Sequence, residues 1–92
     1  MWRVFEGTKA RSALRRLPKE ILKKYEKWKD IVTLSGPKGL RQFTGLKDEA
    51  LKGKWFGFRS SRLNLQYRVM YRVVRDQLIV EVIDLNAHDY RR

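Results

Sequence analysis

The residues in this chain that could do chemistry are mainly basic, and they gather in one stretch. Between positions 52 and 75 every charged residue is positive, namely Lys52, Lys54, Arg59, Arg62, Arg68, Arg72 and Arg75. Aromatic residues lie among them at positions 55, 56, 58, 67 and 71. Cations mixed with aromatic rings suit a phosphate backbone whose bases stack alongside. The two tyrosines in this stretch fit a protein core better than a stacking surface, and some of the arginines are expected to be solvated only.

Cleavage of a phosphodiester would need either a metal ion or a set of acid, base and cationic side chains. Metal-dependent cleavage uses clustered carboxylates or histidines, whereas this chain has scattered acids and a single histidine. We therefore predict no metal site and no cofactor. In the metal-free route an RNA 2′-hydroxyl attacks the adjacent phosphate, which requires a base, an acid and nearby cations. The candidates are Glu49, His88 and Tyr90 for proton transfer, with Arg68, Lys52 and Lys54 as phosphate clamps.

The composition limits the kinds of partner and location. A chain of 92 residues has room for one domain, over residues 1–92, with one modest core. Its formal net charge of +12 favours a polyanionic partner, which could be nucleic acid, an acidic protein segment or a membrane surface. It has no cysteine, and no apolar stretch approaches the roughly 18 to 20 residues that cross a bilayer. We expect a cytoplasmic protein without a membrane segment.

The stretch from 63 to 74 is expected to form the central element of the site. Its odd positions from Leu63 to Val73 are apolar or aromatic, while its even positions are mainly polar. A period of two is typical of a β-strand with one buried face. Arg68 and Arg72 should therefore project from the opposite face, where a strand would hold them more rigidly than a loop.

The N-terminal half of the chain predicts one strand and two helices. A strand is expected over residues 1–6, followed by a short helix over 9–17 with Thr8 as its N-cap. Pro18 suits the first turn of a second helix over 18–34. The buried face of that helix should consist of Ile21, Tyr25, Trp28 and Val32.

The C-terminal half predicts three more strands. After a short helical turn near 38–42, a strand is expected over 55–59, with a tight connection through 60–62 into the central stretch. Residues 78–85 are apolar on both faces, which indicates a strand flanked on both edges. The order β-α-α-β-β-β predicts an α+β fold, in which a two-helix hairpin packs on one face of a mostly antiparallel four-stranded sheet.

Four segments of the chain resemble the RelE/YoeB superfamily of bacterial type II toxins. They are Leu51-Lys52-Gly53, Arg59-Ser60-Ser61-Arg62-Leu63, Gln66-Tyr67-Arg68-Val69-Met70-Tyr71 and Asn86-Ala87-His88-Asp89-Tyr90. The histidine closely followed by tyrosine is similar to the mRNA-cleaving, YoeB-like branch. This resemblance implies an mRNA interferase, an endoribonuclease that cuts mRNA in the ribosomal A site through a 2′,3′-cyclic phosphate. It also implies a cognate antitoxin whose acidic segment silences the toxin.

The resemblance further implies roles for individual residues. Arg68 would hold the scissile phosphate and stabilise its developing charge. Glu49 or His88 would take the 2′-hydroxyl proton, and the other, or Tyr90, would assist the leaving 5′-oxygen. The remaining candidates for RNA or phosphate contact are Lys52, Lys54, Arg59, Arg62 and Arg72, the last alternatively an antitoxin contact.

Two other functions are compatible with these residues. Related toxins of the ParE type share the fold and much of the Tyr-Arg strand but poison DNA gyrase without cleaving RNA. A non-catalytic basic module that binds nucleic acid would use the same window of cations. Either alternative would make the set of Glu49, His88 and Tyr90 accidental.

Overall fold

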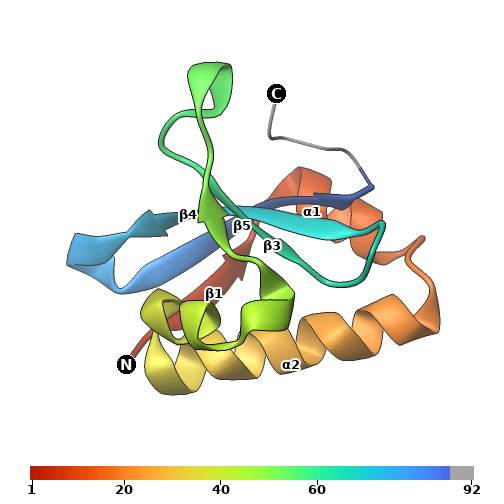
Figure 1. Ribbon diagram of the computed structural model, residues 1–92, viewed down its shortest axis with the longest axis horizontal. Coiled ribbons are helices and arrows are strands. Elements are labelled where there is room, and N and C mark those ends of the chain that lie inside the picture. The colour runs from red at the N-terminus through yellow and green to blue at the C-terminus, as the bar shows by residue number, and fades with distance from the viewer. Residues whose placement is uncertain (88–92) are drawn as a thin grey trace.

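The computed structural model describes residues 1–87. Within this part the strands and α-helices are β1 (Arg3–Glu6), α1 (Thr8–Leu14), α2 (Lys19–Ser35), β2 (Glu49–Ala50), β3 (Arg59–Arg62), β4 (Arg68–Val74) and β5 (Ile79–Asn86). Short 3-10 helices are η1 (Pro37–Gln42), η2 (Thr44–Leu46), η3 (Gly53–Trp55) and η4 (Arg75–Gln77). Figure 1 shows α2 running along one face of the sheet, while residues 51–58 rise from the other. No helix among the described residues is long and apolar enough to cross a membrane.

The strands form one sheet in the order β1-β5-β4-β3-β2. Strand β1 runs parallel to β5, and the other neighbours are antiparallel. This confirms the predicted α+β fold and the position of the last strand between two others. The predicted number of four strands is too low by one, because residues 49–50 pair with β3 as an edge strand. Two residues are too few to leave a periodic signal in a sequence.

The strand predicted over 55–59 is wrong in its position. Residues 53–55 form η3, and Gly57 has a φ of +96°, so the chain turns at this point. Strand β3 instead covers residues 59–62, which the sequence assigns to a tight connection. Its central residues, Ser60 and Ser61, are buried. A run of serines between arginines carries none of the β-branched or aromatic residues by which a strand is recognised.

The connection into β4 also differs from the prediction. The alternating pattern predicts a strand from residue 63, whereas β4 begins at Arg68. Asn64 folds the chain back, because its Oδ1 accepts hydrogen bonds from the backbone N–H groups of Gln66 and Tyr67, at 2.8 and 2.6 Å. Asparagine commonly forms such a turn. As a result Leu65 is 85% exposed instead of buried.

The two helices match the predicted ones, with differences at their ends. The N-cap of α1 is Gly7 and not Thr8, and no side chain caps the helix. Helix α2 begins directly after Pro18, whose fixed φ suits the entry to a helix. It ends at Ser35, and its C-cap is Gly36, where φ is +74° and an added Cβ would lie 2.8 Å from Nε1 of Trp2. Both the backbone angle and the close packing therefore require glycine at this position.

The main core lies between the helices and one face of the sheet. The predicted buried face of α2 is confirmed as Ile21, Tyr25, Trp28 and Val32. The ring of Trp28 meets that of Tyr71 edge to face, with centroids 5.3 Å apart. Tyr71 is fully buried, so it belongs to the core and offers no surface on which a base could stack.

The opposite side of the sheet, here called the open face, carries a smaller apolar cluster. Its members are Leu51, Met70, Trp55, Phe58 and Ile83. Three of these belong to the segment from 51 to 58, so this segment folds over the open face and does not extend as a strand (Figure 1). The cluster explains why the aromatic residues at 55 and 58 look like a strand in the sequence, since they are apolar and partly buried without being extended.

A β-bulge in β5 changes which residues reach the open face. Tyr71 pairs with Val82, and the preceding residue Met70 pairs with Asp84, which leaves Ile83 as the extra residue. Residues directly opposite each other in a sheet point to the same side. Asp84 therefore shares the open face with Met70. Bulges commonly redirect side chains in this way near functional sites.

Candidate functional site

The strand register brings Glu49 and Arg68 to the open face. Glu49 pairs with Ser60, and Ser60 pairs with Met70. Because paired residues share a side and so do residues two apart along a strand, Glu49, Met70 and Arg68 point the same way. Adjacent strands are about 4.8 Å apart, so β2 and β4 lie about 10 Å apart across β3. Ser60 of β3 lies between Glu49 and Met70, and Arg68 is two residues along β4 from Met70, opposite Arg62. The small serine leaves room for the long side chains of Glu49 and Arg68 to extend toward each other.

Arg68 is buried and has no ion-pair partner among residues 1–87. It is 9% exposed, and its Nη1 donates a hydrogen bond to the carbonyl oxygen of Gln66 at 3.3 Å. A guanidinium fixed by packing and not neutralised by a carboxylate can bind an anion through its planar set of donors. The residue opposite Arg68 on β5 is Asn86.

Asn86 borders a hollow of about 670 Å³ on the open face, which Trp55 and Met70 also line. Asp84 lies in this hollow and is 4% exposed. Its carboxylate is compensated by Nζ of Lys9 at 3.2 Å and accepts a hydrogen bond from Nδ2 of Asn86 at 2.5 Å. These contacts fix the end of β5 on the open face, beside Arg68.

Glu49 has no such partners. It is partly exposed, and its side chain makes no hydrogen bond or ion pair within the described part of the chain. It lines a small cavity of about 130 Å³ together with Lys52, which is exposed. Nζ of Lys54 lies 5.5 Å from the centre of the Trp55 ring, a cation–π contact. Both lysines lie in the segment that leads from Glu49 over the open face.

The other three predicted RNA contacts are dispersed. Arg59 forms an ion pair with Asp48 at 2.6 Å, and Arg72 forms one with Glu81, also at 2.6 Å. Arg62 lines a separate pocket of about 630 Å³ beside α2, and its Nε is buried without a partner among residues 1–87. Contact of these arginines with RNA stays a prediction, and the structure does not gather them into one cluster.

The sequence-based interpretation missed Asp48. Its carboxylate is fully buried and accepts hydrogen bonds from Arg59 Nε and Nη2 at 2.9 and 2.6 Å, from Ser61 Oγ at 2.7 Å, and from the Tyr71 hydroxyl. Ser61 Oγ in turn accepts a hydrogen bond from Trp28 Nε1 at 2.9 Å. We call these five residues the Asp48 network. The one signal in the sequence is that an acidic residue, Asp48, directly precedes the candidate base Glu49. The residue type alone does not reveal which partners Asp48 has.

The Asp48 network sets the ionisation of two of its members. Burial raises the pKa of Tyr71, and the negative charge of Asp48 raises it further, so the phenol stays neutral. Burial alone would lower the pKa of Arg59, but the hydrogen bond and the charge of Asp48 outweigh this effect and raise it. The network therefore places the ion pair of Arg59 and Asp48 beneath β2. This pair anchors Asp48, the residue next to Glu49.

Two of the predicted proton-transfer residues, His88 and Tyr90, lie outside the described residues. In the sequence His88 follows Asn86 by two positions. Within residues 1–87, no group of three or more histidine, cysteine or acidic residues could hold a metal ion.

Comparison with known proteins finds similarity in structure only. No family model matches the chain, and no curated protein matches it. YafQ from E. coli superposes with a TM-score of 0.78 at 10% identity, over 96% of this chain and 94% of that chain. A YoeB/ParE toxin from Agrobacterium tumefaciens gives 0.74 at 23% identity, over 95% and 99%. A chain of the toxin–antitoxin complex RelBE2 from Mycobacterium tuberculosis gives 0.70 at 22% identity, over 95% and 98%.

These similarities extend over nearly the whole of each chain. At such low identities they establish the fold, which is that of the RelE, YoeB and YafQ toxins. The resemblance drawn from the sequence segments is thereby confirmed at the level of the fold. What the site does has to be argued from its own residues.

Proposed function

We propose that this chain is the toxin of a type II toxin–antitoxin system and acts as a metal-independent endoribonuclease on mRNA. One observation carries the proposal. A carboxylate and a guanidinium, Glu49 and Arg68, face the same side of the sheet, and neither is in an ion pair within the described residues. These are the charged groups that metal-free cleavage of RNA requires. The RelE-like fold supports the same reading.

The reaction would proceed by transfer of the phosphoryl group within the RNA. Glu49 or His88 removes the proton of a 2′-hydroxyl, and this oxygen attacks the neighbouring phosphorus. Arg68 binds the non-bridging oxygens and stabilises the charge that builds on them. The bond to the 5′-oxygen breaks, and the other proton-transfer group, or Tyr90, protonates the leaving oxygen. The products are a 2′,3′-cyclic phosphate and a free 5′-hydroxyl.

The strong positive charge supports two further parts of the proposal. A net charge of +12 favours association with RNA, and we propose that the substrate is mRNA in the ribosomal A site, in the cytoplasm. The same charge favours a cognate antitoxin with an acidic segment. Several similar structures are toxin–antitoxin complexes, among them YoeB–YefM from Staphylococcus aureus.

The test is to map the 5′ ends of an mRNA exposed to the purified protein, with and without ribosomes and with EDTA. We expect cuts that need ribosomes, survive EDTA and leave a cyclic phosphate. Glu49→Gln or His88→Gln should slow cleavage by about 10²- to 10⁴-fold, as expected for loss of a proton-transfer group. Glu20→Gln, at an exposed position on α2, is the matched control. Intact mRNA under all conditions would refute the function, whereas wild-type rates in both site variants would refute the site.

Gyrase poisoning is the second candidate, because one similar structure is called a YoeB/ParE toxin. It predicts inhibition of gyrase supercoiling by the purified protein while ribosome-bound mRNA stays intact. Inhibited supercoiling together with uncut mRNA would replace the ribonuclease proposal.

A further inference from the structure

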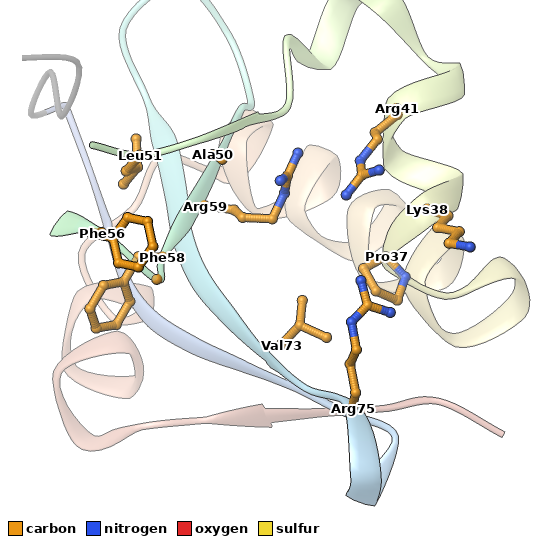
Figure 2. Close-up of a pocket in the computed structure, with 11 residues that line it drawn as sticks. Pro37, Lys38, Arg41, Ala50, Leu51, Phe56, Phe58, Arg59, Val73 and Arg75 are labelled. Carbon is orange, nitrogen blue, oxygen red and sulfur yellow. The ribbon is translucent and has the colours of Figure 1, made fainter. Parts of the chain in front are cut away.

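A second basic site lies at a corner of the sheet where β4 extends past β3. The first residue of β3, Arg59, is opposite Tyr71, so Val73 and the residues after it have no neighbour on β3. Residues of η1 approach this gap from the helix side and leave a cavity of about 290 Å³. Figure 2 shows this cavity, here called the corner pocket.

The corner pocket collects positive charge that the protein does not neutralise. Lys38 and Arg41 of η1 and Arg75, just after β4, line it, and all three are exposed. None of them forms an ion pair with an acid within residues 1–87, and no acidic residue lines the pocket. Arg59 also lines it but is paired with Asp48. In Figure 2 the head groups of Arg41, Arg59 and Arg75 extend toward one common space.

The other wall of the corner pocket is apolar and aromatic. Leu51, Phe56 and Phe58 line it, on the side away from the cations (Figure 2). Phe56 is 83% exposed, so its ring does not contribute to the core. An exposed ring beside uncompensated cations matches a nucleotide, whose base stacks on the ring while its phosphate binds the cations.

The corner pocket adjoins the proposed catalytic surface. Ala50 and Leu51 line both the corner pocket and the small cavity at Glu49 and Lys52. A strand of RNA seated at Glu49 would therefore reach the corner pocket by crossing β2. This continuity favours RNA over an acidic protein as the occupant.

We propose that the corner pocket is a second phosphate-binding site, which holds a nucleotide of single-stranded RNA next to the one that is cleaved. The inference rests on the proposed function in taking RNA as the polyanion. Lys38, Arg41 and Arg75 bind the phosphate, and Phe56 stacks on the base. The pocket sets how the RNA is aligned and takes no part in proton transfer.

The test measures binding of a single-stranded 2′-O-methyl RNA, which cannot be cleaved because its attacking hydroxyl is blocked. Fluorescence anisotropy over a range of salt concentrations gives both affinity and salt dependence. The test variant is the triple substitution Lys38→Gln, Arg41→Gln and Arg75→Gln. The matched control is Arg15→Gln, Lys19→Gln and Lys23→Gln, which removes the same charge from exposed positions around the start of α2.

We expect the test variant to bind about 10- to 100-fold more weakly at low salt and the control less than about threefold more weakly. The plot of log affinity against log salt should flatten by about 0.7 in the test variant, since the pocket holds one phosphate and each phosphate neutralised on a single strand contributes about 0.7. Phe56→Ala should weaken binding by at least about fivefold at every salt concentration, because a base–aromatic stack is lost. Equal losses of RNA affinity in the two triple variants would show that binding depends on net charge alone, and this would overturn the proposal.

Two other outcomes are also decisive. If the test variant kept its affinity for RNA but lost binding of a polyglutamate peptide, the pocket would serve an acidic protein and the RNA proposal would be wrong. Failure of the proposed function looks different: the wild type would bind the oligonucleotide through the pocket yet leave ribosome-bound mRNA intact. Thermal melts confirm folding, and the single variants Arg41→Gln and Arg75→Gln repeat the measurement if the triple variant does not fold.

Discussion

The two faces of the sheet use the same kinds of side chain for opposite purposes. Asp48 and Glu49 are consecutive carboxylates. The side chain of Asp48 is fully buried and accepts four hydrogen bonds, whereas Glu49 is partly exposed and its side chain has no partner in the described chain. Arg59 and Arg68 differ likewise: Arg59 is paired with Asp48, and Arg68 with no acid among residues 1–87. In these two pairs of residues, Asp48 and Arg59 satisfy each other's charges and stabilise the fold, whereas Glu49 and Arg68 on the open face are available for a ligand.

This separation has a physical cause. A buried carboxylate is tolerated only when its charge and lone pairs are fully satisfied, and the Asp48 network provides this beneath β2. With β2 anchored from one side, Glu49 can stay unpaired on the other without loss of order. The contrast suggests that stability and activity can be altered independently, and four predictions test it.

The largest expected effect is on stability and comes from Asp48→Ala. Removing one partner of a buried ion pair leaves a charge uncompensated, so we expect the free energy of unfolding to fall by about 3 to 5 kcal/mol. Urea denaturation measures the change. Glu49→Ala serves as the control and should alter stability by no more than about 0.5 kcal/mol. Similar losses of stability in Asp48→Ala and Glu49→Ala would mean that the two carboxylates do not differ in what they contribute to the fold.

The next effect is on activity and comes from Arg68→Gln. Loss of a cation that stabilises transition-state charge should slow RNA cleavage by about 10²- to 10³-fold, measured on ribosome-bound mRNA. Arg16→Gln is the control, because Arg16 is exposed and lies outside the candidate site. It should change the rate by less than about twofold. Equal rates in the two variants would exclude Arg68 from the site.

The helix-covered face should make the protein sensitive to alkaline pH. Burial raises the pKa of both Tyr25 and Tyr71, so each keeps its proton in the folded protein. The unfolded chain loses these protons above a pH of about 10, so stability is complete below that pH and falls above it, by about 1.4 kcal/mol per pH unit for each tyrosine. Tyr25→Phe should make the decline shallower in urea titrations between pH 9 and 11. An unchanged slope would show that Tyr25 ionises equally in both states.

The smallest effect should come from the exposed ion pair between Arg72 and Glu81. Its side chains are 53% and 24% exposed, and surface pairs contribute only about 0.2 to 1 kcal/mol. Glu81→Gln should lower the free energy of unfolding by no more than about 1 kcal/mol, and added salt should shrink the difference further. If Glu81→Gln lowered the free energy of unfolding as much as Asp48→Ala does, the Arg72–Glu81 ion pair would also be essential to the fold.

Periodic patterns predicted the elements that bury a continuous stripe. Apolar spacing, which is local information, predicts helix α2 with its buried residues, the position of β5 between two other strands, and the two-layer fold. The same patterns gave wrong strand positions where contacts between distant segments determine the structure. Trp55 and Phe58 are apolar because they cover the open face, and residues 59–62 form a strand because β4 pairs with them.

The candidate site divides in the same way. The residue types needed for metal-free RNA cleavage, and the resemblance to RelE-like toxins, can be read from the sequence, and so can the alternation that turns Arg68 away from the core. Which of two adjacent carboxylates is buried cannot be read from it. Asp48 finds its partners 11, 13 and 23 positions along the chain, and only the strand register brings them together. The spacing of apolar residues determines which secondary structure a segment can form. Pairing between distant segments decides which charged side chains are neutralised and which stay available to bind a ligand.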